Sequence, residues 1–131
     1  GPRLSKREMG LAEWIAESYL RAAFQPPGIA GLRKLAPHNQ AAVTQLVELL
    51  STQGRLVKIS SEYYLHANCE QRMQELIRGR LAESAGLTVS EIRELLGTTR
   101  KYAVPLCEYL DRIGLTVRQG DLRVLKHSMR P

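Results

Sequence analysis

The sequence predicts a mainly helical α+β protein built from two similar units, each with three helices followed by a β-hairpin. Three observations support this prediction. Apolar residues recur at three-and-four spacing over several stretches, which is typical of one helical face. Short stretches with alternating apolar residues follow Gly54 and Gly114 and are typical of strands. The pattern of the first half also recurs in the second half at an offset of 60 residues, without a gap.

The first half is expected to contain three helices and two strands. Pro26-Pro27-Gly28 ends the first helix, and Gly54 stops the third. The helices are expected at about 10–24, 31–35 and 37–53, and the strands at 56–59 and 63–65.

The second half carries sharper start and stop signals. Thr88 and Glu91 have the spacing of a capping box, and Gly97 follows as a helix stop. Gly114 closes the next helix, and Gly120-Asp121 is expected to form the two-residue turn of a hairpin. The helices are expected at about 69–85, 89–96 and 98–113, and the strands at 115–118 and 122–125.

The two-residue turn also sets the register of this hairpin. It pairs Val117 with Val124, so that both valines share the core face, and it pairs Arg118 with Arg123 on the exposed side. Like charges directly opposite each other are destabilising unless an anion lies beside them. Two interpretations therefore stay open, a site for an anion or two solvated arginines on an ordinary hairpin.

The repeat indicates two domains of the same kind. The offset aligns Gly54 with Gly114, Val57 with Val117, and Leu65 with Leu125. Three helices followed by a β-wing is the order of a winged helix-turn-helix, in which the third helix is the usual recognition element. We therefore predict two tandem winged-helix domains, at 1–66 and 67–131, and limited freedom between them because no Gly/Ser-rich or proline-rich linker separates them. Gly1-Pro2 is interpreted as a remnant of cloning on part of a longer protein.

The net charge of +6 and the pI near 9.7 favour an anionic partner. The excess is concentrated at the C-terminal end, because residues 97–131 carry seven basic and three acidic side chains, against twelve and ten in the other 96 residues. The third helix of the second domain opens with Arg100-Lys101-Tyr102, beside the hairpin arginines. Tyr102 is expected either to pack against the wing or to stack on an unpaired base.

Patterns for catalysis and metal binding are absent from the sequence. His38, His66 and His127 lie in separate loop or terminal positions, without a second ligand at metal spacing. Cys69 and Cys107 form no C-x-x-C pair and are expected to be buried thiols in a reducing compartment. No apolar run approaches the length of a membrane span. We therefore expect a binding protein with no enzyme activity, metal, cofactor or membrane contact of its own.

The C-terminal stretch carries a set of residues that resembles a known family. The set is Arg100-Lys101-Tyr102-Ala103, Pro105-Leu106, Glu108-Tyr109-Leu110-Asp111-Arg112, Gly114, Thr116, Arg118, Gly120-Asp121 and Arg123-Val124-Leu125. It resembles the last winged-helix domain of the bacterial selenocysteine-specific translation elongation factor family, SelB. The first domain resembles the preceding winged helix of the same arm by repeat and position.

This resemblance implies an RNA-binding arm that grips a selenocysteine-insertion (SECIS) hairpin in messenger RNA, in the cytoplasm. It implies contacts from Arg100, Lys101, Tyr102, Arg118, Gly120, Asp121, Arg123 and Lys126. It also implies a GTP-binding domain outside this chain, which delivers selenocysteyl-tRNA to the ribosome. We expect a monomer whose first domain is a spacer or scaffold, and contact between that domain and the ribosome is left open.

Two other functions compete with RNA binding. A regulator that binds double-stranded DNA would place the third helix in a major groove, although the exposed side of that helix lacks the Asn, Gln and Ser that read base edges. A protein-interaction winged helix would leave the C-terminal concentration of basic charge unexplained.

Overall fold

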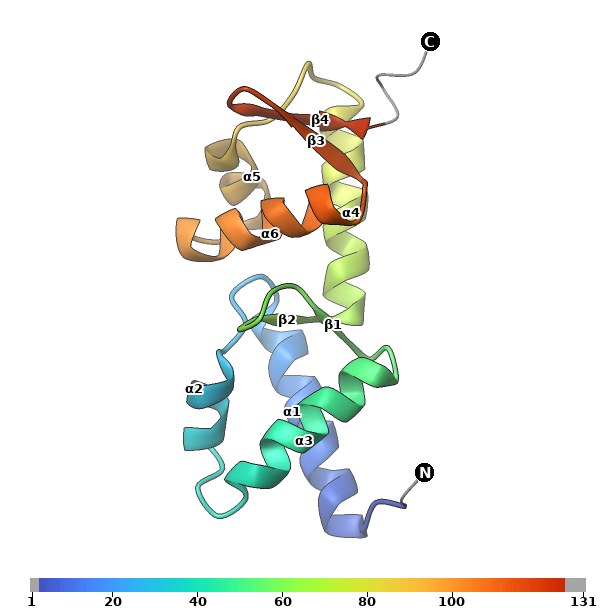
Figure 1. Ribbon diagram of the computed structural model, residues 1–131, viewed down its shortest axis with the longest axis vertical. Helices are drawn as coiled ribbons and strands as arrows, with labels where there is room; N and C mark the ends of the chain where they lie inside the picture. The colour runs from blue at the N-terminus through green and yellow to red at the C-terminus, as the bar shows by residue number, and fades with distance from the viewer. Residues whose placement is uncertain (1–2, 127–131) are drawn as a thin grey trace. The chain divides into compact units, whose positions relative to one another are not determined.

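The computed structural model describes residues 3–126 and divides the chain into two compact units, Gly1–Cys69 and Glu70–Pro131 (Figure 1). The division falls within the first turn of helix α4 (Ala67–Leu81), a few residues after the boundary predicted between 66 and 67. Each unit has the predicted order of helices followed by an antiparallel hairpin. None of the helices in the described part of the chain is long and apolar enough to cross a membrane.

The first unit packs three helices and a hairpin around one apolar core. Its elements are α1 (Lys6–Ala22), α2 (Ile29–Lys34), α3 (Gln40–Thr52), β1 (Leu56–Lys58) and β2 (Tyr64–His66). Helix α3 packs against α1, α2 and β1, and α1 also packs against β2. Ile15, Leu32 and Val43 are fully buried in the core between the three helices.

Helix α1 begins earlier than the apolar pattern indicates, because a capping box precedes that pattern. The Ser5 hydroxyl accepts a hydrogen bond from the Glu8 backbone N–H at 3.1 Å, and Glu8 Oε1 accepts from the Ser5 N–H at 2.9 Å. The hydrogen bond from the Ser5 backbone lowers the pKa of Glu8. Two backbone donors that a helix start leaves unpaired are thus satisfied.

Loss of this cap should destabilise the first unit. We expect Ser5→Ala to lower the free energy of unfolding by about 1 kcal/mol, because the N-terminal donors lose their acceptor. Chemical denaturation of the full chain measures the change. Ser5→Asp keeps an acceptor at the same position and serves as the control. Equal losses in both variants would contradict the capping role.

The second unit repeats this arrangement. After α4, it contains α5 (Val89–Leu96), α6 (Arg100–Arg112), β3 (Thr116–Gln119) and β4 (Leu122–Leu125). Helix α5 has the predicted bounds, with the capping box of Thr88 and Glu91 at its start and Gly97 in the left-handed conformation (φ 65°) at its end. Helix α6 packs against α5 and β3 (Figure 1).

A partly buried polar contact ties α6 to the first turn of α4. The Tyr109 hydroxyl donates to Glu70 Oε2 at 2.6 Å, and Gln74 Nε2 donates to the same oxygen at 2.6 Å. Burial, together with the hydrogen bond to Glu70, raises the pKa of Tyr109. Cys107 lies on the buried side of the same helix, as predicted, and burial raises the pKa of its thiol to about 11. The hydrogen bonds to Glu70 hold α6 in place against α4.

The second hairpin has the predicted register. Val117 pairs with Val124 and Arg118 pairs with Arg123, across a turn in which Gly120 has φ 62°. Val124 is buried, whereas Val117 is only half-buried.

The gapless alignment of the two units is wrong in the hairpin. In the first unit Val57 pairs with Leu65, so Leu65 corresponds to Val124 and not to Leu125. The reason is that the first hairpin has one more residue in its loop, which shifts its second strand relative to the repeat.

Candidate nucleic-acid interface

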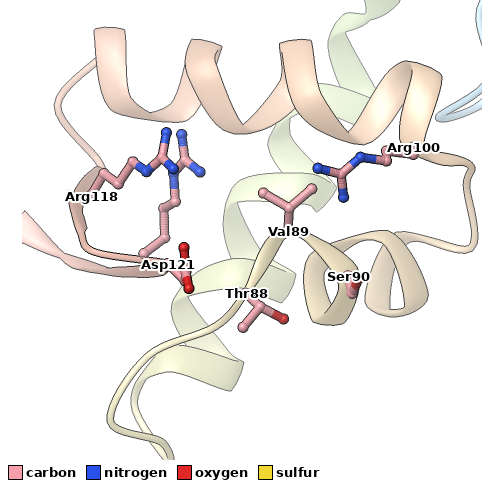
Figure 2. Close-up of a pocket in the computed structure, with 7 residues that line it drawn as sticks. Thr88, Val89, Ser90, Arg100, Arg118 and Asp121 are labelled. Atoms are coloured by element: carbon pink, nitrogen blue, oxygen red, sulfur yellow. The ribbon is translucent and has the colours of Figure 1, made fainter.

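A pocket of about 320 Å³ lies in the second unit where α5 begins, α6 begins and the hairpin turns. It is lined by Thr88, Val89, Ser90, Arg100, Arg118, Asp121 and Arg123. Figure 2 shows Arg100 and Arg118 pointing into it from opposite sides, with Val89 between them. Four predicted contact residues, Arg100 at the start of α6 and three from the hairpin, therefore share one site.

The start of α5 is held beside the hairpin by a backbone bridge. The Leu87 N–H donates to the Arg123 carbonyl at 2.9 Å, and the Arg123 N–H donates to the Leu87 carbonyl at 2.8 Å. Thr88, Val89 and Ser90 follow directly and reach the pocket. No sequence pattern predicts this pairing, because a single bridging residue carries no alternation of apolar and polar positions.

Gly86 makes the close approach to the hairpin possible. Its φ is 154°, and a Cβ added there would lie 3.1 Å from Leu122 Cβ and 3.2 Å from the Arg123 carbonyl oxygen. Only glycine fits this conformation and this distance without strain.

The pocket joins the positive ends of two helices to basic side chains. Thr88 is the N-cap of α5, and Arg100 is the first residue of α6. Helix α6 has no acidic residue in its first turn, and within the described residues Thr99 makes no side-chain capping bond. A cation at a helix N-terminus is unfavourable, whereas an anion there is stabilised. The arrangement therefore favours binding of an anionic group such as a phosphate.

Lys101 and Tyr102 lie next to the pocket and are not among the residues that line it. Lys101 is exposed, and its Nζ lies 5.3 Å from the centre of the Tyr102 ring. Tyr102 is half-buried, which agrees with partial packing and leaves one part of the ring at the surface. A stacking role for this ring remains a prediction.

Arg118 is an exposed cation at the tip of the hairpin. Its Nε donates to the Gly120 carbonyl at 2.9 Å, which orients the guanidinium across the turn. Asp121 supplies the acidic side chain among the residues that line the pocket. This arrangement matches the prediction for Arg118, Gly120 and Asp121 as neighbours at the wing tip.

The prediction that both hairpin arginines are exposed is wrong for Arg123. Its side chain is only 6% exposed and forms an ion pair with Asp111, whose side chain is 28% exposed. Arg123 Nη2 lies 2.9 Å from Asp111 Oδ2, and the hydrogen bond to Asp111 raises the pKa of Arg123. The C-terminal end of α6 covers this side of the hairpin. We therefore expect Arg123→Ala to destabilise the fold, because the substitution would leave Asp111 without its partner.

Lys126 is exposed and is the last residue that the structure describes. Its backbone N–H donates to the Leu115 carbonyl at 3.1 Å, beside the hairpin and outside the set that lines the pocket. Its predicted role as a flanking contact stays a prediction.

The histidines do not form a site in the described part of the chain. His66 lies at the end of β2 and not in a loop, and its Nδ1 accepts from the Asn68 N–H at 3.0 Å. Burial lowers the pKa of His66, and the positive charge of Arg55 lowers it further. His38 is exposed, His127 lies outside the described residues, and within those residues no cluster has the ligands for a metal ion.

The helices, the hairpin and the strand-like bridge of Leu87 make the second unit a winged helix with a basic pocket between its helix starts and its wing. Residues 80–125 match the family model described as elongation factor SelB, winged helix. The predicted resemblance to a SelB winged helix is thereby confirmed.

Two curated relatives extend the match over both units. The chain is 28% identical over 123 residues to the selenocysteine-specific elongation factor of Desulfomicrobium baculatum, which covers 94% of this chain and 19% of the relative. It is 26% identical over 105 residues to that of Escherichia coli (strain K12), which covers 80% of this chain and 17% of the relative. The chain thus spans about a fifth of the length of these relatives.

Two solved structures share the fold. The mRNA-binding domain of elongation factor SelB from E. coli, in complex with SECIS RNA, has a TM-score of 0.75 and 25% identity and covers 92% of this chain and 98% of that chain. A bacterial selenocysteine-specific elongation factor, EF-Sec, has a TM-score of 0.66 and 20% identity and covers 93% of this chain and 18% of that chain. The predicted α+β winged-helix class is confirmed.

Proposed function

We propose that this chain is the messenger-RNA-binding part of a selenocysteine-specific elongation factor and that the basic pocket of its second unit grips a SECIS hairpin. The observation that carries the proposal is the convergence of Arg100, Arg118 and Arg123 with the starts of α5 and α6 in one pocket. This pocket lies within the segment that matches the SelB winged helix. The E. coli relative with a similar structure was solved with SECIS RNA.

RNA fits the site better than the two competing partners. A hairpin offers phosphates for the arginines and unstacked loop bases for Tyr102. Helix α6 presents no Asn, Gln or Ser for reading base edges in a DNA major groove. A protein partner would not require two basic side chains, Arg100 and Lys101, at the start of α6, where they are intrinsically unfavourable.

In the whole protein, this binding would place a GTP-binding domain outside the chain near a translating ribosome in the cytoplasm. The second unit would bind the hairpin, and the first unit would act as a spacer. Within this chain the role is binding and not catalysis, and a monomer is sufficient for it, because one unit supplies every residue of the pocket.

The test is the salt dependence of binding to a SECIS hairpin and to a DNA duplex of equal length. We expect the logarithm of the hairpin association constant to fall linearly with the logarithm of salt concentration, by about 0.7 to 0.9 for each phosphate contact. Fluorescence anisotropy with a labelled hairpin measures this slope. Affinity that does not change with salt, or tighter binding to the duplex, would contradict the proposal.

A further inference from the structure

We propose that Asp111 is a positioning residue that turns Arg123 into a fixed set of hydrogen-bond donors without net charge. In this arrangement Arg123 discriminates between RNA hairpins, while Arg100 and Arg118 supply the salt-dependent attraction. The inference rests on the proposed function, because it assigns different roles in RNA binding to the arginines of the same pocket.

The geometry around Asp111 fixes the guanidinium of Arg123. Asp111 Oδ2 accepts from Arg123 Nη2 at 2.9 Å and from Nε at 3.3 Å, so one edge of the guanidinium is bound by one carboxylate. The Thr116 hydroxyl donates to Asp111 Oδ1 at 2.6 Å, which orients the carboxylate in turn. The Arg123 backbone is held by the bridge to Leu87. Both ends of the Arg123 side chain are therefore constrained, and the residue still lines the pocket.

The first unit shows that the fold itself does not need this ion pair. By the 60-residue repeat and the hairpin pairing, the equivalents of Asp111, Thr116 and Arg123 are Ser51, Leu56 and Tyr64. Leu56 and Tyr64 are buried, so an apolar pair fills the same place on the same type of backbone. Replacing a buried ion pair by apolar side chains is often neutral or stabilising. The pair is thus found in the unit that has the pocket, which favours a role in binding.

The charge of the pair determines what Arg123 contributes. Salt dependence comes from counterions that a protein's net positive charge displaces from the phosphates. Asp111 neutralises the charge of Arg123 in the free protein, so Arg123 adds little to the salt dependence of binding. A rigid guanidinium with an occupied edge instead selects acceptors by position, as bidentate arginine contacts do. Arg118 is exposed and its contact is with a carbonyl, so it keeps its full charge.

The experiment uses the full chain and measures two quantities. The first is the salt slope, which is the change in the logarithm of the association constant with the logarithm of salt concentration. The second is the ratio of affinities for a SECIS hairpin and for a hairpin of equal length with a scrambled loop. Asp111→Asn should release the charge of Arg123 and loosen its position. We expect the slope to steepen by about 0.7 to 0.9 and the affinity ratio to fall about tenfold. Arg118→Ala is the matched comparison, because it should make the slope shallower by about the same amount while changing the ratio little. An unchanged slope and ratio in a folded Asp111→Asn variant would overturn the proposal.

A second variant covers the case in which Asp111→Asn fails to fold. The triple substitution Asp111→Ser, Thr116→Leu and Arg123→Tyr installs the residues of the first unit. This variant should fold and should no longer discriminate between the SECIS hairpin and the scrambled hairpin. It should keep the salt slope of the parent, because it removes an ion pair without net charge. A slope that is shallower by one contact would show that Arg123 acts as a free cation and would overturn the proposal.

Failure of the proposed function gives a different result. If the parent chain itself does not bind the SECIS hairpin, the proposed function is wrong, whereas equal binding of both hairpins would show that Arg123 does not discriminate between them. Protection of the Arg123 Nε–H from solvent exchange, followed by NMR in the parent and in Asp111→Asn, tests the positioning without RNA. Equal protection in both would contradict the role of Asp111 directly.

Discussion

The double substitution Arg100→Ala/Arg118→Ala is expected to weaken binding to the SECIS hairpin by on the order of 100-fold or more, because each lost charge-assisted hydrogen bond is worth about 1.5 to 3 kcal/mol. Both side chains are exposed and point into the pocket from opposite sides (Figure 2). Their removal should leave the unfolding free energy nearly unchanged, since neither is buried. Anisotropy titrations at fixed salt and thermal unfolding measure the two quantities.

The first unit supplies a matched control for this variant. Gln40 is the first residue of α3 as Arg100 is of α6, and Lys58 aligns with Arg118 at the offset of 60 residues. Gln40→Ala/Lys58→Ala should therefore leave hairpin affinity within about twofold of the parent, because neither side chain lines the basic pocket and no phosphate contact should be lost. Comparable losses in the two double variants would show that both units hold the RNA and that the spacer role is wrong.

Gly86→Ala should destabilise the second unit by about 2 to 4 kcal/mol, the largest stability change that we expect from a single added methyl group in this chain. The backbone at this position has a positive φ, and the new Cβ would press on Leu122 and on the carbonyl of Arg123. Relief of that clash would move the start of α5 away from the hairpin and open the pocket. Denaturation curves should shift to lower denaturant, and hairpin affinity should fall with them.

Gly79→Ala is the control for the glycine substitution. Gly79 lies in α4 of the same unit, and a Cβ added there meets nothing within 4 Å. Alanine is a better helix former than glycine by about 0.8 to 1 kcal/mol, so this variant should be more stable than the parent. If Gly86→Ala were as stable as Gly79→Ala, the close approach of the 86–88 segment to the hairpin would not exist in solution.

Local signals in the sequence were sufficient for much of the second unit. Helix α5 starts after Thr88 and stops at Gly97 because a capping box and a left-handed glycine act within a few residues of the helix ends. The hairpin register followed from the two-residue turn at Gly120-Asp121. The start of α1 could have been predicted from Ser5 and Glu8, whose spacing is that of a capping box.

Features that depend on segments far apart in the sequence were not predictable in the same way. The bridge between Leu87 and Arg123 joins a single extended residue to a strand that follows α6, so no periodic pattern marks it. The extra residue in the first hairpin loop shifted β2 against the repeat, although the apolar pattern tolerated a gapless alignment.

The sequence by itself determined the fold class, the register of the wing and the cluster of basic residues at the C-terminal end, because all three follow from local spacing and composition. Only the tertiary structure decided what each arginine does. Arg118 and Arg123 are partners in one hairpin and indistinguishable by alternation, yet the end of α6 places the Asp111 carboxylate against Arg123 and leaves Arg118 exposed. Charge in the sequence is a sum, whereas the net charge at a site depends on which carboxylate the folded chain brings within hydrogen-bonding distance.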